Sequence, residues 1–234
     1  MSDAVIWHDL ECGAYRADLP FWRELAHEHA AGPVLDIGAG TGRVAVDLAG
    51  TGQPVIALER DGELAAELRR RAAGLPITVL ELDACAFELP QPLALCIVPM
   101  QTVHLFEDRV AFLACARRAL LPGGLLALAL LGADVLPFEL ELRPDVLDHD
   151  GRRYASTPTA LRLDAGRVVL ERRRTVSGSA TSPASSLDVI ALAQLDPGTL
   201  TIEAEQAGFS AVGLHAIAPT DDHSGSDVLL LARS

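Results

Sequence analysis

A short motif of one acid and three glycines is the strongest chemical signal in the chain. The run Val34-Leu35-Asp36-Ile37 is apolar apart from its acid, and Gly38-Ala39-Gly40-Thr41-Gly42 follows it directly. Glycine lets the backbone pass close beneath a ligand and adopt torsion angles that other residues resist. A helix that begins at such a turn leaves N–H groups free to bind a polar ligand. The motif therefore indicates a small-molecule site at the end of a strand.

Two familiar glycine-rich motifs do not fit this one. The dinucleotide-binding fingerprint Gly-x-Gly-x-x-Gly/Ala requires a small residue at position 43, where Arg43 stands. A phosphate-binding P-loop requires a Lys-Ser/Thr pair after the glycines, and none follows. A nucleotide-dependent oxidoreductase on a similar fold and a non-catalytic cofactor-binding or partner module remain as alternatives.

Two more acids follow later strand candidates. Glu59 comes directly after the apolar run 54–58, and Asp83 follows the run 77–80. A carboxylate at Glu59 can accept two hydrogen bonds from the vicinal hydroxyls of a ribose. A carboxylate at Asp83 can accept from an adenine amino group while the neighbouring backbone contacts the ring edge.

Alternating strands and helices are expected to position these acids. Short apolar runs alternate with amphipathic segments, the runs at 34–37, 54–58, 77–80, 93–98 and 125–131 and the helices at 15–31, 44–48, 63–73 and 109–120. The alternation predicts a parallel sheet with helices on both faces. Ligands of such sheets bind outside the carboxyl ends of the strands, where the acids stand.

The pattern changes after about residue 133. Segments 159–163 and 167–176 flank the turn Asp164-Ala165-Gly166 and predict an antiparallel hairpin. The small polar residues 178–186 predict a mobile loop. We expect one domain, 1–234, with an antiparallel β insertion at 133–195 that serves as a substrate or subunit-contact region.

The C-terminal part returns to helix and strand. A helix is expected at 199–207, with Thr199 as its N-cap and Gly208 as its C-cap. Strands are expected at 212–217 and 228–231.

Four motifs together resemble the class I S-adenosylmethionine-dependent methyltransferases. VLDIGAGTGR, ALERD, ELDA and LLPGG occur in the order and spacing of that family, over roughly residues 15–131, and 199–233 is compatible with it. The resemblance implies an α/β, Rossmann-like doubly wound fold, with a seven-stranded, mostly parallel sheet whose last strand is antiparallel. It also implies S-adenosylmethionine as the cofactor and S-adenosylhomocysteine as the product.

The resemblance also assigns roles to residues. Gly38, Gly40 and Gly42 would wrap the methionine part of the cofactor, and Asp36 would position its amino group. Glu59 would hold the ribose, and Asp83 with Ala84 would contact the adenine. The cofactor-binding set that we predict is Tyr15, Trp22, Asp36, Gly38, Ala39, Gly40, Gly42, Arg43, Glu59, Arg60, Asp83, Ala84 and Pro99.

Three members of this set have a competing interpretation. Tyr15, Trp22 and Arg43 are candidates for closing over the methionine carboxylate. Tyr15 and Trp22 can instead pack in the core or in a lid, and Arg43 can be a surface charge on a helix.

The segment from Val98 to His104 is expected beside the transferred methyl group. It lacks the Asn/Asp/Ser-Pro-Pro-Tyr/Phe motif of family members that methylate adenine, cytosine N4 or glutamine amides, which disfavours those acceptors. His104 is the candidate general base, because an imidazole titrates near neutral pH. The alternative is a packed, hydrogen-bonded structural histidine. Gln101 is the second candidate catalytic residue, as a hydrogen-bond partner of the acceptor.

Two charged clusters are candidates for further sites. Asp221-Asp222-His223 suggests a metal, but three consecutive residues rarely face one ion, so we predict no metal and a polar loop over the pocket. Arg172-Arg173-Arg174 can hold an anionic acceptor or form a solvated hairpin face, and only Arg172 and Arg174 share a side of a strand.

The amino-acid composition limits the kinds of partner and location that are expected for this chain. The 234 residues carry a net charge of −13, which disfavours non-specific nucleic-acid binding. The four cysteines form no CxxC pair, and the apolar run 125–131 is far too short to cross a membrane. With no basic leader at the N-terminus, these features predict a cytoplasmic protein, and the insertion at 133–195 is a candidate contact surface for a homodimer. The predicted reaction is methyl transfer to a nitrogen or oxygen of a small molecule, in a layout similar to that of amino-sugar and glycine-type N-methyltransferases.

Overall fold

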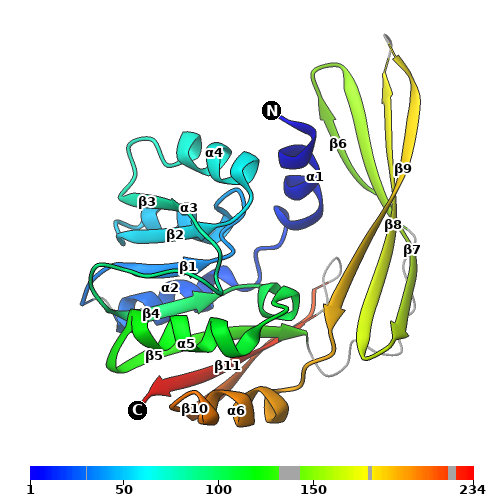
Figure 1. Ribbon diagram of the computed structural model, residues 1–234. Helices are drawn as coiled ribbons and strands as arrows, with labels where there is room; N and C mark the ends of the chain where they lie inside the picture. Colours follow the sequence, from blue (N-terminus) through cyan, green and yellow to red (C-terminus); the bar gives the residue numbers. More distant parts are fainter. Residues whose placement is uncertain (30, 132–142, 179–180, 221–224) are drawn as a thin grey trace. The chain divides into compact units, whose positions relative to one another are not determined.

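A computed structural model describes residues 1–29, 31–131, 143–178, 181–220 and 225–234. The chain divides into two compact units (Figure 1). One consists of Met1–Ala14 with Leu136–Gln194, and the other of Tyr15–Val135 with Leu195–Ser234. The single domain with an insertion at 133–195 stays a prediction, since residues 132–142, where the insertion would begin, lie outside the described part.

The larger unit contains a seven-stranded sheet in the order β10-β11-β5-β4-β1-β2-β3. The strands are β1 (Val34–Ile37), β2 (Val55–Glu59), β3 (Ile77–Glu81), β4 (Leu93–Val98), β5 (Leu120–Leu131), β10 (Phe209–Ile217) and β11 (Ser226–Arg233). All neighbours from β5 to β3 run parallel, and β11 is antiparallel to both β5 and β10. The predicted fold class, with its antiparallel last strand, is confirmed.

Helices of this unit connect and cover the strands (Figure 1). They are α2 (Leu19–Glu28), α3 (Arg43–Gly50), α4 (Gly62–Arg71), the 3-10 helix η1 (Thr102–Leu105), α5 (Arg109–Ala119) and α6 (Pro197–Gln206). The central strand β1 is buried at every position, and the apolar faces of α2 and α3 pack in the same core. Burial of this apolar surface is the main force that fixes the carboxyl ends of β1, β2 and β4 next to one another.

Several predicted boundaries in this unit were wrong. The helix expected at 15–31 is the shorter α2, and the strand expected at 125–131 already begins at Leu120. Helix α6 begins at Pro197, because proline suits the first helical position, and its N-cap is Asp196, which accepts from the Thr199 N–H. Thr199 is therefore not the cap.

The smaller unit is a four-stranded antiparallel sheet with a helix from the N-terminus. Its elements are α1 (Asp3–Cys12), β6 (Asp145–His149), β7 (Arg152–Asp164), β8 (Arg167–Gly178) and β9 (Thr181–Ala193). The strand order is β6-β7-β8-β9. The hairpin predicted around Asp164-Ala165-Gly166 is confirmed, and Ala165 and Gly166 both adopt positive φ, as a tight hairpin turn requires.

One expectation for this unit is wrong, and one of its elements was not predicted. Residues 181–186 are not a loop, because they pair with β8 as the first half of β9, where backbone hydrogen bonding compensates for small polar side chains. The helix α1 was not expected, since its apolar residues do not form a clear stripe. Its acid Glu11 accepts hydrogen bonds from Arg174 and Ser156 on the sheet, at 2.6–2.8 Å.

The arginine run on β8 is correspondingly not a solvated face. Arg172 and Arg174 do share a side of the strand, and both form ion pairs with Glu11 and with Asp188 of β9. Arg173, on the other side, is exposed.

Candidate active site

The turn after β1 has the strained torsions for which glycine is suited. Gly38, Gly40 and Gly42 have φ angles of +71°, +57° and +98°. A Cβ atom on Gly38 would lie 2.3 Å from Cγ2 of Thr102, and one on Gly42 would lie 2.3 Å from Cδ1 of Leu68. The glycines are thus required both by backbone conformation and by the close packing of η1 and α4 against the turn.

Asp36, in the middle of the sheet, is a buried acid without a hydrogen bond. It lies on β1 between Ala57 of β2 and Ile97 of β4, and only 1% of its surface is exposed. Among the described residues, neither carboxylate oxygen has a hydrogen-bond partner. Burial raises the pKa of Asp36 to about 7; the nearby charge of Arg43 and the backbone N–H of Ala45 oppose this rise, and the charge of Glu59 reinforces it. Such a group is costly to ionise until a donor or a cation reaches it.

Glu59, at the end of β2, fastens the glycine turn. One carboxylate oxygen accepts from the Gly40 N–H at 2.8 Å, and the other accepts from the Asp61 N–H at 2.9 Å. Because each oxygen has two lone pairs, the carboxylate can still accept two further hydrogen bonds.

The next strand ends in a more open segment. Asp83 is exposed after β3 and accepts from the Cys85 N–H at 2.7 Å, while Ala84 beside it is buried. Arg60 is exposed at the end of β2. Since β3 pairs with β2 up to Glu59 and Glu81, the acids at 59 and 83 follow adjacent strands on the same edge of the sheet.

Tyr15, Trp22 and Arg43 are brought together by an acid that sequence reasoning did not single out. Asp18 accepts two hydrogen bonds from the Arg43 guanidinium, at 2.6 and 2.7 Å, and one from the indole N–H of Trp22, at 2.8 Å. The guanidinium of Arg43 also lies 5.2 Å from the ring centroid of Tyr15. The only signal in the sequence is that Asp18 precedes a helix, where an acid normally indicates a cap, yet its side chain makes no cap bond.

After β4 ends at Val98, the chain turns sharply and leads to Gln101 and His104, the candidate residues on the acceptor side. Met100 has a φ of +55°, an uncommon value for a side chain of this size, and Gln101 follows it half-buried. His104 is 1% exposed, and its Nε2 accepts from the Leu131 N–H at 3.1 Å. A nitrogen in that bond cannot take up a proton until the bond breaks.

The structure therefore brings most of the predicted site residues close to one another. Asp36, the glycine turn and Glu59 form one contiguous group, and Thr102 ties the His104 segment to it. Ala39 and Pro99 are buried at the ends of β1 and β4. Residues 221–224, which include the Asp221-Asp222-His223 triplet, lie outside the described part.

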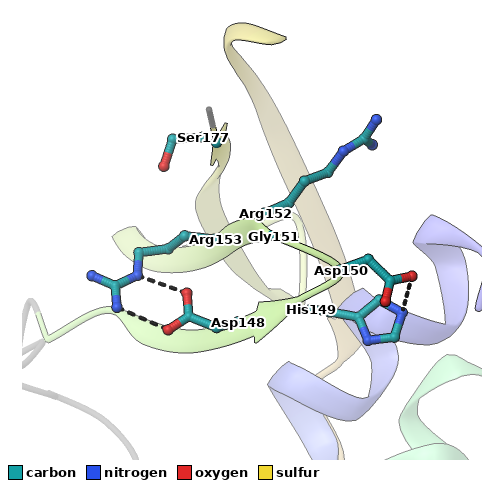
Figure 2. A pocket seen from close by; sticks show the side chains of 8 residues that line it. Asp148, His149, Asp150, Gly151, Arg152, Arg153 and Ser177 are labelled. Carbon is teal, nitrogen blue, oxygen red and sulfur yellow. Dashed lines mark hydrogen bonds and ion pairs between the residues drawn. The ribbon is translucent and has the colours of Figure 1, made fainter. Parts of the chain in front are cut away.

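A hollow elsewhere in the described chain is a weaker candidate for the functional site than this group of residues. An open hollow at the β6–β7 turn is lined by Asp148, His149, Asp150, Gly151, Arg152, Arg153, Ser177 and Gly178 (Figure 2). In it Arg153 is paired with Asp148, and none of the predicted site residues lines it. Within the described residues, no three His, Cys, Asp or Glu side chains are grouped so that they can hold a metal. No described helix has the length and apolarity needed to cross a membrane.

Comparison with known proteins agrees with this geometry. Residues 34–124, from β1 to the turn in β5, match the model of a family described as a methyltransferase domain. No curated protein sequence matches the chain.

Solved structures share the whole fold. The sugar N-methyltransferase KedS8 from Streptoalloteichus sp ATCC 53650 is 16% identical with a TM-score of 0.80, over 100% of this chain and 93% of that one. CcbJ methyltransferase from Streptomyces caelestis is 22% identical with a TM-score of 0.72, over 95% and 98%. CalS10, an amino pentose methyltransferase from Micromonospora echinaspora solved with S-adenosylmethionine, is 18% identical with a TM-score of 0.73, over 100% and 98%.

The central part of the chain thus matches a methyltransferase domain, and the chain has the fold of these solved methyltransferases.

Proposed function

We propose that the protein transfers the methyl group of S-adenosylmethionine to a nitrogen or oxygen nucleophile of a small molecule. The observation that carries the proposal is the buried, unpartnered carboxylate of Asp36 beside the glycine turn. A protonated amino group supplies the charge and the N–H donors that this carboxylate lacks. The amino acid part of the cofactor bears such a group, so the residues present fit it.

The remaining acids suit the nucleoside part. Glu59 has free lone pairs for the ribose hydroxyls while it holds the turn through Gly40. Asp83 and Ala84 stand at the end of the adjacent strand, where an adenine would follow the ribose. When bound, the cofactor supplies a methyl group on a positively charged sulfur; the protein's part is to orient it and to exclude water.

Gln101 and His104 are the proposed acceptor-side residues. Gln101 can hydrogen-bond an acceptor, and His104 can serve as a general base only after Nε2 releases the Leu131 N–H. His104→Gln distinguishes base from support, because an amide oxygen can accept from Leu131 but cannot act as a base. Full activity of His104→Gln assigns His104 a structural role, whereas loss of activity without loss of cofactor binding assigns it the base role.

For the acceptor we propose a small amine-bearing or hydroxyl-bearing molecule, with amino sugars tested first. The support is the shared fold with KedS8 and CalS10, which are described as a sugar and an amino pentose methyltransferase. A homodimer and a cytoplasmic location are further proposals, the latter supported by four free cysteines. Light scattering during size-exclusion chromatography tests the assembly.

A thermal-shift titration with S-adenosylmethionine, S-adenosylhomocysteine and NADH tests the cofactor. We expect the two adenosyl sulfur compounds alone to stabilise the protein, by about 2.7 kcal/mol at one hundred times the dissociation constant. Asp36→Asn is the matched variant and should lose most of this effect. Stabilisation by NADH alone would favour an oxidoreductase, and cofactor binding without turnover across the acceptor panel would favour a non-catalytic module.

A further inference from the structure

Met100, two residues after the end of β4, has a backbone conformation that its side chain makes costly. Its φ of +55° lies in the left-handed region, where a Cβ atom is crowded and a bulky residue is an outlier. The other non-glycine residues with positive φ in the described parts of the chain are Asp150 and Ala165. Both stand in two-residue hairpin turns, which require such torsions, whereas Met100 stands in no hairpin.

The packing of the segment after Met100 explains why the chain turns so sharply there. Thr102 lies against the turn after β1, where its Cγ2 is 2.3 Å from the position of a Cβ atom on Gly38. His104 bonds to the backbone of Leu131 at the end of β5. Strands β1 and β5 are the two neighbours of β4, so the chain must reverse at once to reach both. Glycine would make this turn at lower cost, so the turn explains the backbone of Met100 and not its side chain.

The apolar core does not explain the Met100 side chain either. Met100 is half-buried, and among the described residues it is absent from the apolar cluster that packs around β1. Strained residues gather at ligand-binding and active sites, and the ligands of parallel sheets bind at the carboxyl ends of the strands. A partly covered, strained apolar side chain at this edge of the sheet therefore points to a ligand.

The place of Met100 in the sheet fits the sulfur end of the proposed cofactor. Asp36 on β1 is proposed to hold the amino group, and Glu59 at the end of β2 is proposed to hold the ribose. The sulfur joins these two parts, and its methyl group must face away from the nucleoside for an acceptor to reach it. Strand β4 lies on the side of β1 opposite to β2. The Cα atom of Met100 lies within about 7 Å of that of Thr102, which contacts the glycine turn.

We propose that the Met100 side chain contacts the sulfur and the transferable methyl group of S-adenosylmethionine. This inference rests on the proposed function. A thioether side chain is apolar, flexible and polarisable, so it can cover the reactive carbon and exclude water from it. The cost of the left-handed backbone is retained because glycine would lack this contact.

The test combines ligand affinities with the melting temperature of the ligand-free protein. Calorimetry gives the affinities for S-adenosylhomocysteine and 5′-methylthioadenosine, and competition gives that for adenosine, which lacks the sulfur. Met100→Ala keeps the strain and removes most of the side chain, so both sulfur compounds should bind roughly tenfold more weakly and adenosine equally well. Met100→Leu keeps the apolar bulk and should lose at most about threefold.

Met100→Gly separates the strain from the contact. It should lose the same affinity as Met100→Ala, yet melt about 2 °C above that variant, because glycine adopts positive φ freely. At an ordinary position the order of the two melting temperatures is the reverse.

Two controls make the result specific. Leu105→Ala truncates a 41% exposed apolar side chain on the same segment and should leave all three affinities unchanged. Ala165→Gly relieves the same kind of strain in a hairpin of the smaller unit, and it should raise stability without changing any affinity.

Each failure has a distinct meaning. If the wild type binds both sulfur compounds and Met100→Ala and Met100→Gly bind them equally well, the contact is refuted and the proposed function stands. A parallel loss of adenosine affinity would also refute the contact, because Met100 would then support the whole site. A melting temperature of Met100→Gly below that of Met100→Ala would refute the strain. If the wild type binds none of the three ligands, the proposed function itself fails. Should Met100→Ala not fold, the affinities of Met100→Gly and Met100→Leu still decide the question.

Discussion

Glu11 in the four-stranded unit and Asp36 in the seven-stranded unit are both buried acids, with 4% of the Glu11 side chain and 1% of Asp36 exposed. Glu11 accepts from Arg174 and Ser156 and faces Arg172, whereas Asp36 has no hydrogen-bond partner among the described residues. Burial alone raises the pKa of both. In Glu11 the arginines outweigh burial and lower its pKa, and in Asp36 burial prevails.

The contrast between Glu11 and Asp36 distinguishes an acid that stabilises the fold from an acid that is available to a ligand. A buried acid with a complete set of donors stabilises the fold around it, and removing it leaves cations unpaired. A buried acid with none is a cost to the fold that only a ligand can offset. The expected effects of substituting each kind of acid differ in sign.

The largest effect is expected from Glu11→Gln. The amide cannot satisfy Arg172 and Arg174 together, so the free energy of unfolding of the smaller unit should fall by roughly 3 kcal/mol. Urea unfolding followed by Trp7 fluorescence measures it, with the exposed acid Glu88→Gln as the control. Unchanged stability would mean that the ion pairs around Glu11 contribute nothing and would remove one side of the comparison.

The substitution Asp36→Asn should change the free energy of unfolding in the opposite direction and by a smaller amount. Because the folded-state pKa of about 7 lies above the unfolded value of 3.8, the native state holds an extra proton between them, and wild-type stability falls as pH rises through that interval. The amide should therefore raise the stability of the free protein by about 1 kcal/mol at a pH above 7.

The same linkage predicts that the gain is smaller near pH 5, inside that interval, and disappears only below the unfolded pKa of 3.8. Urea unfolding of both proteins at the two pH values is the measurement. A destabilising Asp36→Asn at the higher pH would show that the carboxylate has stabilising partners and would contradict its assignment as a ligand site.

The smallest effect is expected from Asp148→Asn. Asp148 and Arg153 form two hydrogen bonds of 2.9 Å at the β6–β7 turn, a geometry like that of Glu11 with Arg174, but both side chains are more than 60% exposed (Figure 2). Water and salt screen such a pair, so no resolvable change in melting temperature should occur. A clear loss of melting temperature would show that the geometry of an ion pair, and not its burial, determines how much these carboxylates stabilise the protein.

Local sequence signals sufficed for the sheet and for the central part of the site. Apolar runs bounded by glycine and proline identified the parallel strands, and the acid before the glycine turn identified Asp36. These features depend on residues within one strand and the turn that follows, where spacing and burial are directly coupled.

Long-range partners could not be read from the sequence. Arg43 and Asp18 are 25 positions apart, and Arg174 and Glu11 are 163 positions apart, so no local pattern connects them. The contact of His104 with the backbone of Leu131 is equally invisible, although it decides what His104 can do. The small polar residues at the start of β9 resemble a loop until β8 is present to pair with them.

The smaller unit is built from two segments that lie far apart in the sequence, Met1–Ala14 and Leu136–Gln194, and this has a consequence for folding during synthesis. Helix α1 leaves the ribosome before the strands it packs against, and Tyr154, whose hydroxyl bonds to Asp3, follows 151 residues later. At ten residues, a helix isolated from its packing partners is only marginally stable in water. Val5, Ile6 and Trp7 therefore stay exposed to solvent or to chaperones while the first five strands of the larger sheet are made, and α1 docks only after the hairpins of β6–β9 emerge.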